Sequence, residues 1–193
     1  MESRLYEVLK NFKGARGTED SLNEEFKNIA ETVFYSGHFL VNSCSEDEYK
    51  IVITCIEFYY HEDEGKIKDL KKYLKGKDEY GYPIGSICPN PSGVDVIFDD
   101  PEKKYHASFL IRGYQAVEKD NTIYENNKKS RTWNTQDFWY DLFGGANMLN
   151  KGRFSIEWVD NGEDYSTIAN SYTMERINLN DGKLWAYTKA KLV

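Results

Sequence analysis

The chain has 193 residues, a formal net charge of −7 at pH 7, 40% hydrophobic and 15% aromatic residues, which suits one domain with a sizeable core. It contains no apolar run long enough for a transmembrane helix and no signal peptide, and its three cysteines show no paired spacing, so we expect a cytoplasmic protein with reduced thiols. The acidic balance counts against a nucleic-acid binder, although local lysine clusters matter more than the sum.

The first residues predict two helices. Residues 2–12 form a weak helix within an N-terminal extension that covers residues 1–20. A capping box then opens a second helix, in which Ser21 accepts from the amide of Glu24 while the Glu24 side chain reaches back. Gly37 ends this helix, whose apolar stripe has helical spacing and consists of Leu22, Phe26, Ile29, Ala30, Val33 and Phe34.

A β-hairpin follows the second helix. Its first strand spans residues 38–42, and its second is a β-branched and aromatic run at residues 49–61. More strands are expected at residues 94–98, 106–114, 154–159, 171–179 and 184–192. The sequence therefore predicts a single α+β domain, with a curved, mostly antiparallel β-sheet and peripheral helices.

The strand at residues 49–61 carries a carboxylate near its end, Glu57. Neither side of this strand is polar, which indicates a central strand covered on both faces. A carboxyl group buried without a cation holds its proton more tightly, which is how proteins prepare a general base near neutral pH. The alternative is a strand-end glutamate that faces solvent or pairs with a lysine. Strand alternation places Glu57 on the same face as Ile51, Ile53, Cys55 and Tyr59.

Several common chemistries are absent from the sequence. It has no phosphate-binding glycine loop and no Gly-x-Ser-x-Gly nucleophile motif. The three histidines are scattered, and His61 with the acidic residues 62–64 is explained better as a surface turn than as a cation site. We therefore expect no metal and no cofactor.

Three segments, in their order along the chain, resemble the alkyladenine (3-methyladenine) DNA glycosylases. The sequence TCIEFY at residues 54–59 is similar to the family's Val-Glu-Thr-Glu-Ala-Tyr strand, whose second glutamate is the catalytic base. The sequence SGVDVIFD at residues 92–99 aligns without gaps on its Tyr-Gly-x-x-x-x-x-Asn hairpin. In the same register, FLIR at residues 109–112 falls on its Val-Leu-Leu-Arg strand.

A fourth group of segments extends the resemblance towards the end of the chain. Residues 144–149 resemble the family's Gly-Pro-x-Lys-Leu segment, and residues 175–179 and 184–187 resemble its closing strands. The resemblance covers residues 30–190 and implies a glycosylase-like fold.

Carried over by position, the resemblance implies catalytic roles for Glu57 and Arg112. Glu57 would activate water for attack on C1′ of a nucleoside flipped out of DNA, and Tyr59 would stack on the extruded base. Arg112 would bind a backbone phosphate or orient Glu57. The alternative for Arg112 is a plain ion pair with a carboxylate such as Glu57.

Other substrate positions depart from the family's pattern. The family's wedge tyrosine falls on Ser92, and its pocket asparagine falls on Asp99. Its pocket histidine falls on Lys68, and His61 is the histidine nearest to the catalytic strand motif. The resemblance therefore places Ser92, Asp99 and His61 beside the substrate, with altered chemistry.

The leading hypothesis is a divergent hydrolase of N-glycosidic bonds that excises modified purines in base excision repair, with DNA or a nucleoside as its weakly held partner. The alternative is a catalytically silent relative that binds a small molecule or a protein. A plain domain without a site at Glu57 is the third hypothesis, and it requires that Glu57 is exposed. No membrane partner is expected.

Overall fold

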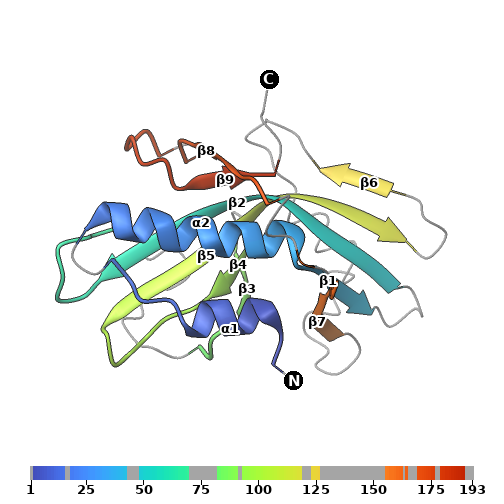
Figure 1. Cartoon of the computed structure of the whole chain (residues 1–193), viewed down its shortest axis with the longest axis horizontal. Coiled ribbons are helices and arrows are strands. Elements are labelled where there is room, and N and C mark those ends of the chain that lie inside the picture. The colour runs from blue at the N-terminus through green and yellow to red at the C-terminus, as the bar shows by residue number, and fades with distance from the viewer. Residues whose placement is uncertain are drawn as a thin grey trace.

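The computed structural model describes residues 2–15, 18–42, 48–69, 82–90, 93–118, 123–126, 155–162, 164, 169–176 and 179–189. Within these ranges two helices lie on one face of an open sheet, and every described strand pairing is antiparallel (Figure 1). The chain is thus an α+β protein with peripheral helices, as predicted. None of the described helices has the length and apolar character needed to cross a membrane.

The helices are α1 (Arg4–Lys10) and α2 (Glu19–Tyr35). The capping box predicted at Ser21 is wrong, because Thr18 is the N-cap of α2 and its hydroxyl accepts from the Ser21 amide at 3.2 Å. Ser21 lies inside the first turn instead, where its hydroxyl donates to the Thr18 carbonyl at 3.1 Å. The acidic Glu19 and Asp20 favour this earlier start, because they face the positive end of the helix dipole.

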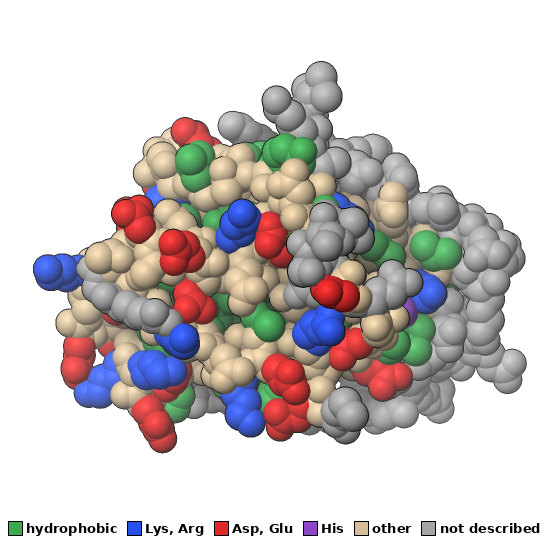
Figure 2. All heavy atoms as spheres, viewed as in Figure 1, with side chains coloured by type: hydrophobic (Ala, Val, Ile, Leu, Met, Phe, Trp, Pro, Cys, Tyr) green, Lys and Arg blue, Asp and Glu red, His purple; other side chains and the backbone are tan. Residues whose placement is uncertain are grey.

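Helix α2 packs on the sheet through the predicted apolar stripe, all six members of which are buried. Phe26 illustrates this packing, since its ring stacks on Phe58 with 4.1 Å between the ring centroids. The exposed side of the helices carries acidic and basic side chains intermixed (Figure 2). The helices therefore cover one face of the sheet and present a mixed-charge surface to water.

The nine described strands form one sheet. Six of the strands are neighbours in the order β3-β4-β5-β2-β1-β7. In addition, β6 pairs with β5, β9 with β2, and β8 with β9. The strands are β1 (Gly37–Asn42), β2 (Glu48–Glu62), β3 (Ser86–Asn90), β4 (Gly93–Ile97), β5 (Tyr105–Glu118), β6 (Ile123–Asn126), β7 (Ser155–Asp160), β8 (Tyr172–Met174) and β9 (Ala186–Thr188).

These strands agree with the predicted order, apart from β3 and β6, which were not expected, and from β8 and β9, which are shorter than predicted. The predicted segment at residues 144–149 lies outside the described residues. Gly37 does not end α2 but begins β1, after a helix that ends at Tyr35 with Ser36 as its C-cap. A Cβ on Gly37 would lie 2.2 Å from the Val159 carbonyl oxygen of β7, so the close approach of β7 requires a glycine there.

The alternation of side chains between the two faces of the sheet is interrupted halfway along β2. Its register with β5 shifts twice, between Ile53 and Cys55 and between Cys55 and Ile56, and it skips Thr54 on β2 and Arg112 on β5. Such bulges turn the strand, so the alternation of faces restarts after them. The main apolar core accordingly contains Ile51 and Ile53 before the shift, and Ile56, Phe58 and Tyr60 after it.

The predicted face of Glu57 is therefore wrong. Glu57 and Tyr59 lie on the face of β2 opposite to the helix-packed core, whereas Ile51 and Ile53 point into that core. The prediction that β2 is a central strand is confirmed, because β5 pairs with one of its edges while β1 and β9 pair with the other.

Candidate functional site

The face of the sheet turned away from the helices carries many polar side chains, beside the apolar Leu110 and Ile97, and these polar side chains are nevertheless buried. Strand alternation after the bulge assigns to it Glu57, Tyr59 and His61 of β2, His106, Ser108 and Arg112 of β5, and Asp95 of β4. Glu57, Asp95 and Ser108 have no exposed surface at all. Buried polar groups are costly unless they are hydrogen-bonded or paired, so this face is held together by specific contacts.

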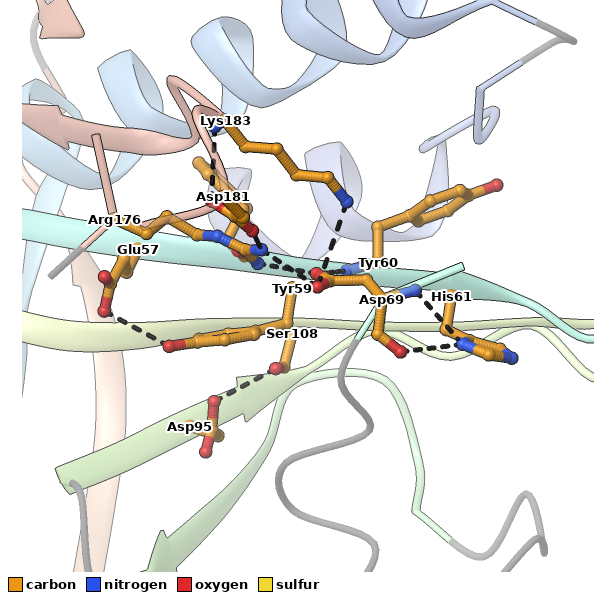
Figure 3. A network of polar contacts seen from close by, with 11 residues as sticks. Glu57, Tyr59, Tyr60, His61, Asp69, Asp95, Ser108, Arg176, Asp181 and Lys183 are labelled. Carbon is orange, nitrogen blue, oxygen red and sulfur yellow. Dashed lines mark hydrogen bonds and ion pairs between the residues drawn. The ribbon is translucent and has the colours of Figure 1, made fainter. Parts of the chain in front are cut away.

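The centre of this face is an ion pair. The Arg112 Nε donates to the Glu57 Oε2. The Tyr59 hydroxyl donates to the same oxygen at 3.3 Å (Figure 3). The side chain of Glu57 is 0% exposed and that of Arg112 is 7% exposed. The structure thus joins three residues that the glycosylase resemblance selected, and it rules out a solvent-facing Glu57.

The charge of Glu57 affects two neighbours. Burial, followed by the negative charge of Glu57, raises the pKa of the Cys55 thiol to about 12. The same two causes, in the same order, raise the pKa of the Tyr59 hydroxyl, and Asp95 adds to the effect. Both groups therefore stay protonated at neutral pH, and the Tyr59 hydroxyl is a hydrogen-bond donor to the carboxylate.

A second carboxylate lies in the same part of the sheet. The Ser108 hydroxyl donates to the Asp95 Oδ1 at 3.0 Å (Figure 3). Ser108 is directly opposite Tyr59 in the register of β2 and β5, so the two residues whose hydroxyls contact these carboxylates are neighbours across the strands.

His61 and Asp99 were predicted beside the substrate, but they belong to a separate cluster nearer the end of β2. Antiparallel pairing sets His61 opposite His106. The His106 Nδ1 lies 3.2 Å from the Asp99 Oδ2, and its Nε2 lies 3.4 Å from the Asp63 Oδ2. The His61 Nδ1 contacts the backbone oxygen of Asp69 at 2.8 Å.

This histidine cluster shows what the sequence reading missed. His106 was not expected at a site, and only the strand register, with His61 opposite His106, could have indicated it. Asp63 is one of the acidic residues beside His61 that the sequence predicts in a surface turn. Asp99 also accepts from the Ala107 amide at 2.8 Å, so its carboxylate serves the backbone as well as the imidazole. Among the described residues, no group of three or more His, Cys, Asp or Glu side chains is arranged to hold a metal ion.

Arg176 connects the edge of β2, beyond its pairing with β9, to two carboxylates. Its guanidinium bonds both oxygens of Asp69, at 2.6 and 2.9 Å, and it also contacts Asp181 and the Phe58 carbonyl (Figure 3). Asp69 in turn accepts from the Tyr60 amide at 3.2 Å. Arg176 and Asp69 thus satisfy the Phe58 carbonyl and the Tyr60 amide, which a further strand would otherwise bond.

The Arg176 guanidinium also restricts which part of the Tyr59 ring a ligand could contact. The Arg176 guanidinium lies 5.0 Å from the centroid of the Tyr59 ring and 5.1 Å from that of Trp185. A cation at this distance occupies a face of an aromatic ring. Tyr59 can therefore offer a ligand at most its other face or its edge.

The remaining predicted positions lie elsewhere. Ser92 is outside the described residues. Lys68 is exposed, and its ammonium group donates to the backbone carbonyl of Asp63 at 2.8 Å, so it holds the turn after β2.

The comparisons with known proteins add no relative to this picture. The scan against protein-family models found no match, and the searches of curated proteins and of solved structures returned no significant match either.

Proposed function

We propose that the chain is a divergent hydrolase of N-glycosidic bonds, with modified purine nucleosides, in DNA or free, as its substrates. One observation supports the proposal most. Glu57 and Arg112 come from separate motifs that are 55 residues apart in the sequence, and the fold brings them into contact on one buried face. The proposal extends to the fold, since antiparallel β4, β5 and β2 beside α2 agree with a glycosylase-like arrangement.

The chemistry assigned to Glu57 is proton abstraction from water. As the water oxygen bonds to C1′, the bond from C1′ to the base nitrogen breaks, and the base leaves with the bonding electrons. Positive charge develops at C1′ in the transition state, and the nearby carboxylate stabilises it. Arg112 acts as a positioning residue, because its contact fixes the orientation of the carboxylate.

A second candidate function is a catalytically silent binding module, and the closure of the site favours it. Glu57 is fully buried and bonds Arg112 directly rather than through a water. Hydrolysis requires that this carboxylate gains access to water, whereas a structural ion pair does not. The Arg176 guanidinium on Tyr59 also reduces the aromatic surface that a flipped base would use.

Replacing Glu57 with Gln separates the two functions, because the variant keeps the shape of the side chain and removes the base. The substrates are single-stranded oligonucleotides that contain one alkylated or deaminated purine, and released base is quantified by chromatography. For a hydrolase, the rate of base release should fall by about two to four orders of magnitude. Glu24→Gln, on the exposed side of α2, is the matched control and should keep the wild-type rate.

Circular dichroism and thermal unfolding establish that both variants are folded. Equal rates for wild type and Glu57→Gln would remove Glu57 from the mechanism. A wild-type protein that releases no base from these substrates, yet binds purine bases in calorimetry, would establish the binding module instead.

A further inference from the structure

Tyr59 contacts the Glu57 carboxylate with its hydroxyl and the Arg176 guanidinium with its ring, and all three residues are buried (Figure 3). The hydroxyl lies 3.3 Å from the Glu57 Oε2, and the ring centroid lies 5.0 Å from the Arg176 Cζ. The phenol ring is rigid, so its hydroxyl moves only when the ring moves. A group that packs against the ring therefore helps to fix the position of the hydroxyl.

The guanidinium of Arg176 is itself held in one orientation. Its Nη1 and Nη2 donate to the two carboxylate oxygens of Asp69 at 2.6 and 2.9 Å, which is a two-point contact. The side chains of Arg176 and Asp69 are 0% and 4% exposed. Two-point contacts between arginine and a carboxylate fix the plane of the guanidinium as well as its distance. Asp69 thus sets the plane that Arg176 presents to Tyr59.

The same ion pair also fixes the backbone on both sides of Tyr59. The Arg176 Nη1 donates to the Phe58 carbonyl at 3.1 Å, and the Tyr60 amide donates to the Asp69 Oδ2 at 3.2 Å. Phe58 and Tyr60 are the two neighbours of Tyr59 in β2. The pair therefore holds the backbone before Tyr59, the backbone after it and the face of its ring.

A buried ion pair is weak evidence for stability, because apolar residues of the same volume often stabilise a protein as well or better. What the pair of Arg176 and Asp69 supplies in addition is a defined geometry around one tyrosine. That geometry matters at Glu57, because the Tyr59 hydroxyl and the Arg112 Nε both bond the Oε2 atom. These two donors set the rotation of the carboxyl group, and with it the direction in which Glu57 would meet a water.

We propose that Arg176 and Asp69 are positioning residues of the Glu57 site, and that they act through Tyr59 by keeping its hydroxyl on the Glu57 Oε2. The inference rests on the proposed hydrolase function. A displacement of about 1 Å at a catalytic group can lower a rate about 10²-fold. Loss of the ion pair should therefore lower catalysis at a carboxylate that neither residue touches.

The first test measures kcat and KM for base release from the single-stranded oligonucleotides with one alkylated or deaminated purine. Arg176→Lys keeps the charge but cannot form the two-point contact, and Asp69→Asn keeps an oxygen for the Tyr60 amide but loses the charge. Both variants should lower kcat about tenfold or more and change KM less than about twofold. Wild-type kcat in both would overturn the proposal.

Asp100→Asn is the matched control, because it makes the same chemical change at another ion pair. Asp100 contacts Lys103 at 2.7 Å in the turn between β4 and β5. This variant should keep the wild-type kcat and KM. A loss as large as that of Asp69→Asn would assign the effect to the removal of any surface or buried charge, and would overturn the proposal.

A double-mutant cycle separates positioning through Tyr59 from a general loss of structure. Tyr59→Phe removes the hydroxyl and keeps the ring. If Arg176 acts through that hydroxyl, Arg176→Lys should lower kcat in the wild-type background but change it less than about twofold in the Tyr59→Phe background. Equal losses in the two backgrounds would show a purely structural role and would overturn the proposal.

Crystal structures of Asp69→Asn and Asp100→Asn test the positioning without reference to activity. The distance from the Tyr59 Oη to the Glu57 Oε2 should exceed about 3.5 Å in Asp69→Asn and stay within hydrogen-bond range in Asp100→Asn. Arg176→Lys replaces Asp69→Asn if the latter does not fold. An unchanged distance would overturn the positioning role. A displaced hydroxyl in a protein whose wild type releases no base would support the positioning and refute the hydrolase alone.

Discussion

Glu57 and Arg112 show how much of a buried site depends on two side chains. Both charges are removed from water, and the attraction between them offsets this desolvation only while the pair is intact. The Tyr59 hydroxyl adds a hydrogen bond to the same carboxylate oxygen. The pair is therefore sensitive to the loss of either partner, whether its role is catalytic or structural.

Replacement of Arg112 with Ala should destabilise the protein strongly, because it leaves the Glu57 carboxylate buried without its cation. We expect the free energy of unfolding in urea to fall by about 3–5 kcal/mol. The double variant Glu57→Gln with Arg112→Met should recover much of this loss, because it removes both charges and keeps the volume. A loss below about 1 kcal/mol in Arg112→Ala would contradict the pairing.

The Cys55 thiol should be unreactive in the native protein. Burial and the charge of Glu57 raise its pKa to about 12, from an ordinary value near 9, so the nucleophilic thiolate is scarce at pH 8. Because the folded pKa lies above the unfolded one, the stability from this group is complete below about pH 9 and is lost as the pH rises towards 12. Labelling with iodoacetamide at pH 8, followed by peptide mass spectrometry, should modify Cys55 only after unfolding in urea. Equal labelling of native and unfolded protein would disprove the prediction.

The residues of the ion pair could be predicted from the sequence, but the residues around them could not. Glu57, Tyr59 and Arg112 stand in strand motifs with recognisable order, so a resemblance was enough to select them. His106 and Arg176 come to the site through strand register and through a loop that has no local pattern. Their contacts depend on which residues the fold places opposite one another, and no spacing along the chain expresses this.

At the scale of the elements, the paired bulge of β2 and β5 decides which side chains face the site. Regular alternation along β2 predicts Glu57 on the face of Ile51 and Ile53. The register shift at Cys55 places Glu57 on the opposite face instead. The same shift lets Ile111 and Tyr114 of β5 both point into the core. A bulge is set jointly by two strands, so a reading of one strand alone misses it. The existence and order of the strands, in contrast, follow from their β-branched and aromatic composition.

Gly113 is the residue of β5 that permits this bulge. A Cβ at Gly113 would lie 2.7 Å from the Thr54 Oγ1 and 2.8 Å from the Cys55 Cβ, so the two strands would have to separate. Gly113→Ala should therefore lower the free energy of unfolding by about 1–3 kcal/mol, measured by urea denaturation. Gly162→Asn is the control, because position 162 has a positive φ that Asn tolerates and no atom within 4 Å of its Cβ. Equal stability of wild type and Gly113→Ala would show that the strands can separate at no cost.

At the scale of the whole molecule, the sheet divides the protein into two unlike sides. The helices cover one face through aliphatic and aromatic side chains, whereas the other face contains the paired carboxylates, arginine and histidines. A ligand of the proposed hydrolase would therefore bind to the face of the sheet opposite to α1 and α2. On the helix side, the basic and acidic side chains of the described residues are intermixed and form no continuous basic surface for a nucleic-acid backbone (Figure 2).

The charge of the whole chain predicts weak binding to duplex DNA. A protein with a net charge of −7 should neutralise few phosphates and release few counterions, which gives low affinity and a shallow dependence on salt. Ser92, at the wedge position of the glycosylase resemblance, cannot fill the gap left by a flipped base, and unstacking costs a few kcal/mol. Base release should therefore be fastest from single strands, mismatches or free nucleosides.

The measurement titrates a fluorescently labelled duplex with one alkylated purine at two salt concentrations, beside the matching single strand. We expect dissociation constants for the duplex that are no tighter than those of ordinary non-specific binding, about 10⁻⁴–10⁻⁶ M at physiological salt. An unmodified duplex is the control and should bind equally weakly. Tight binding of the damaged duplex with a steep salt dependence would require a basic surface that the chain's net charge conceals, and would identify duplex DNA as the substrate.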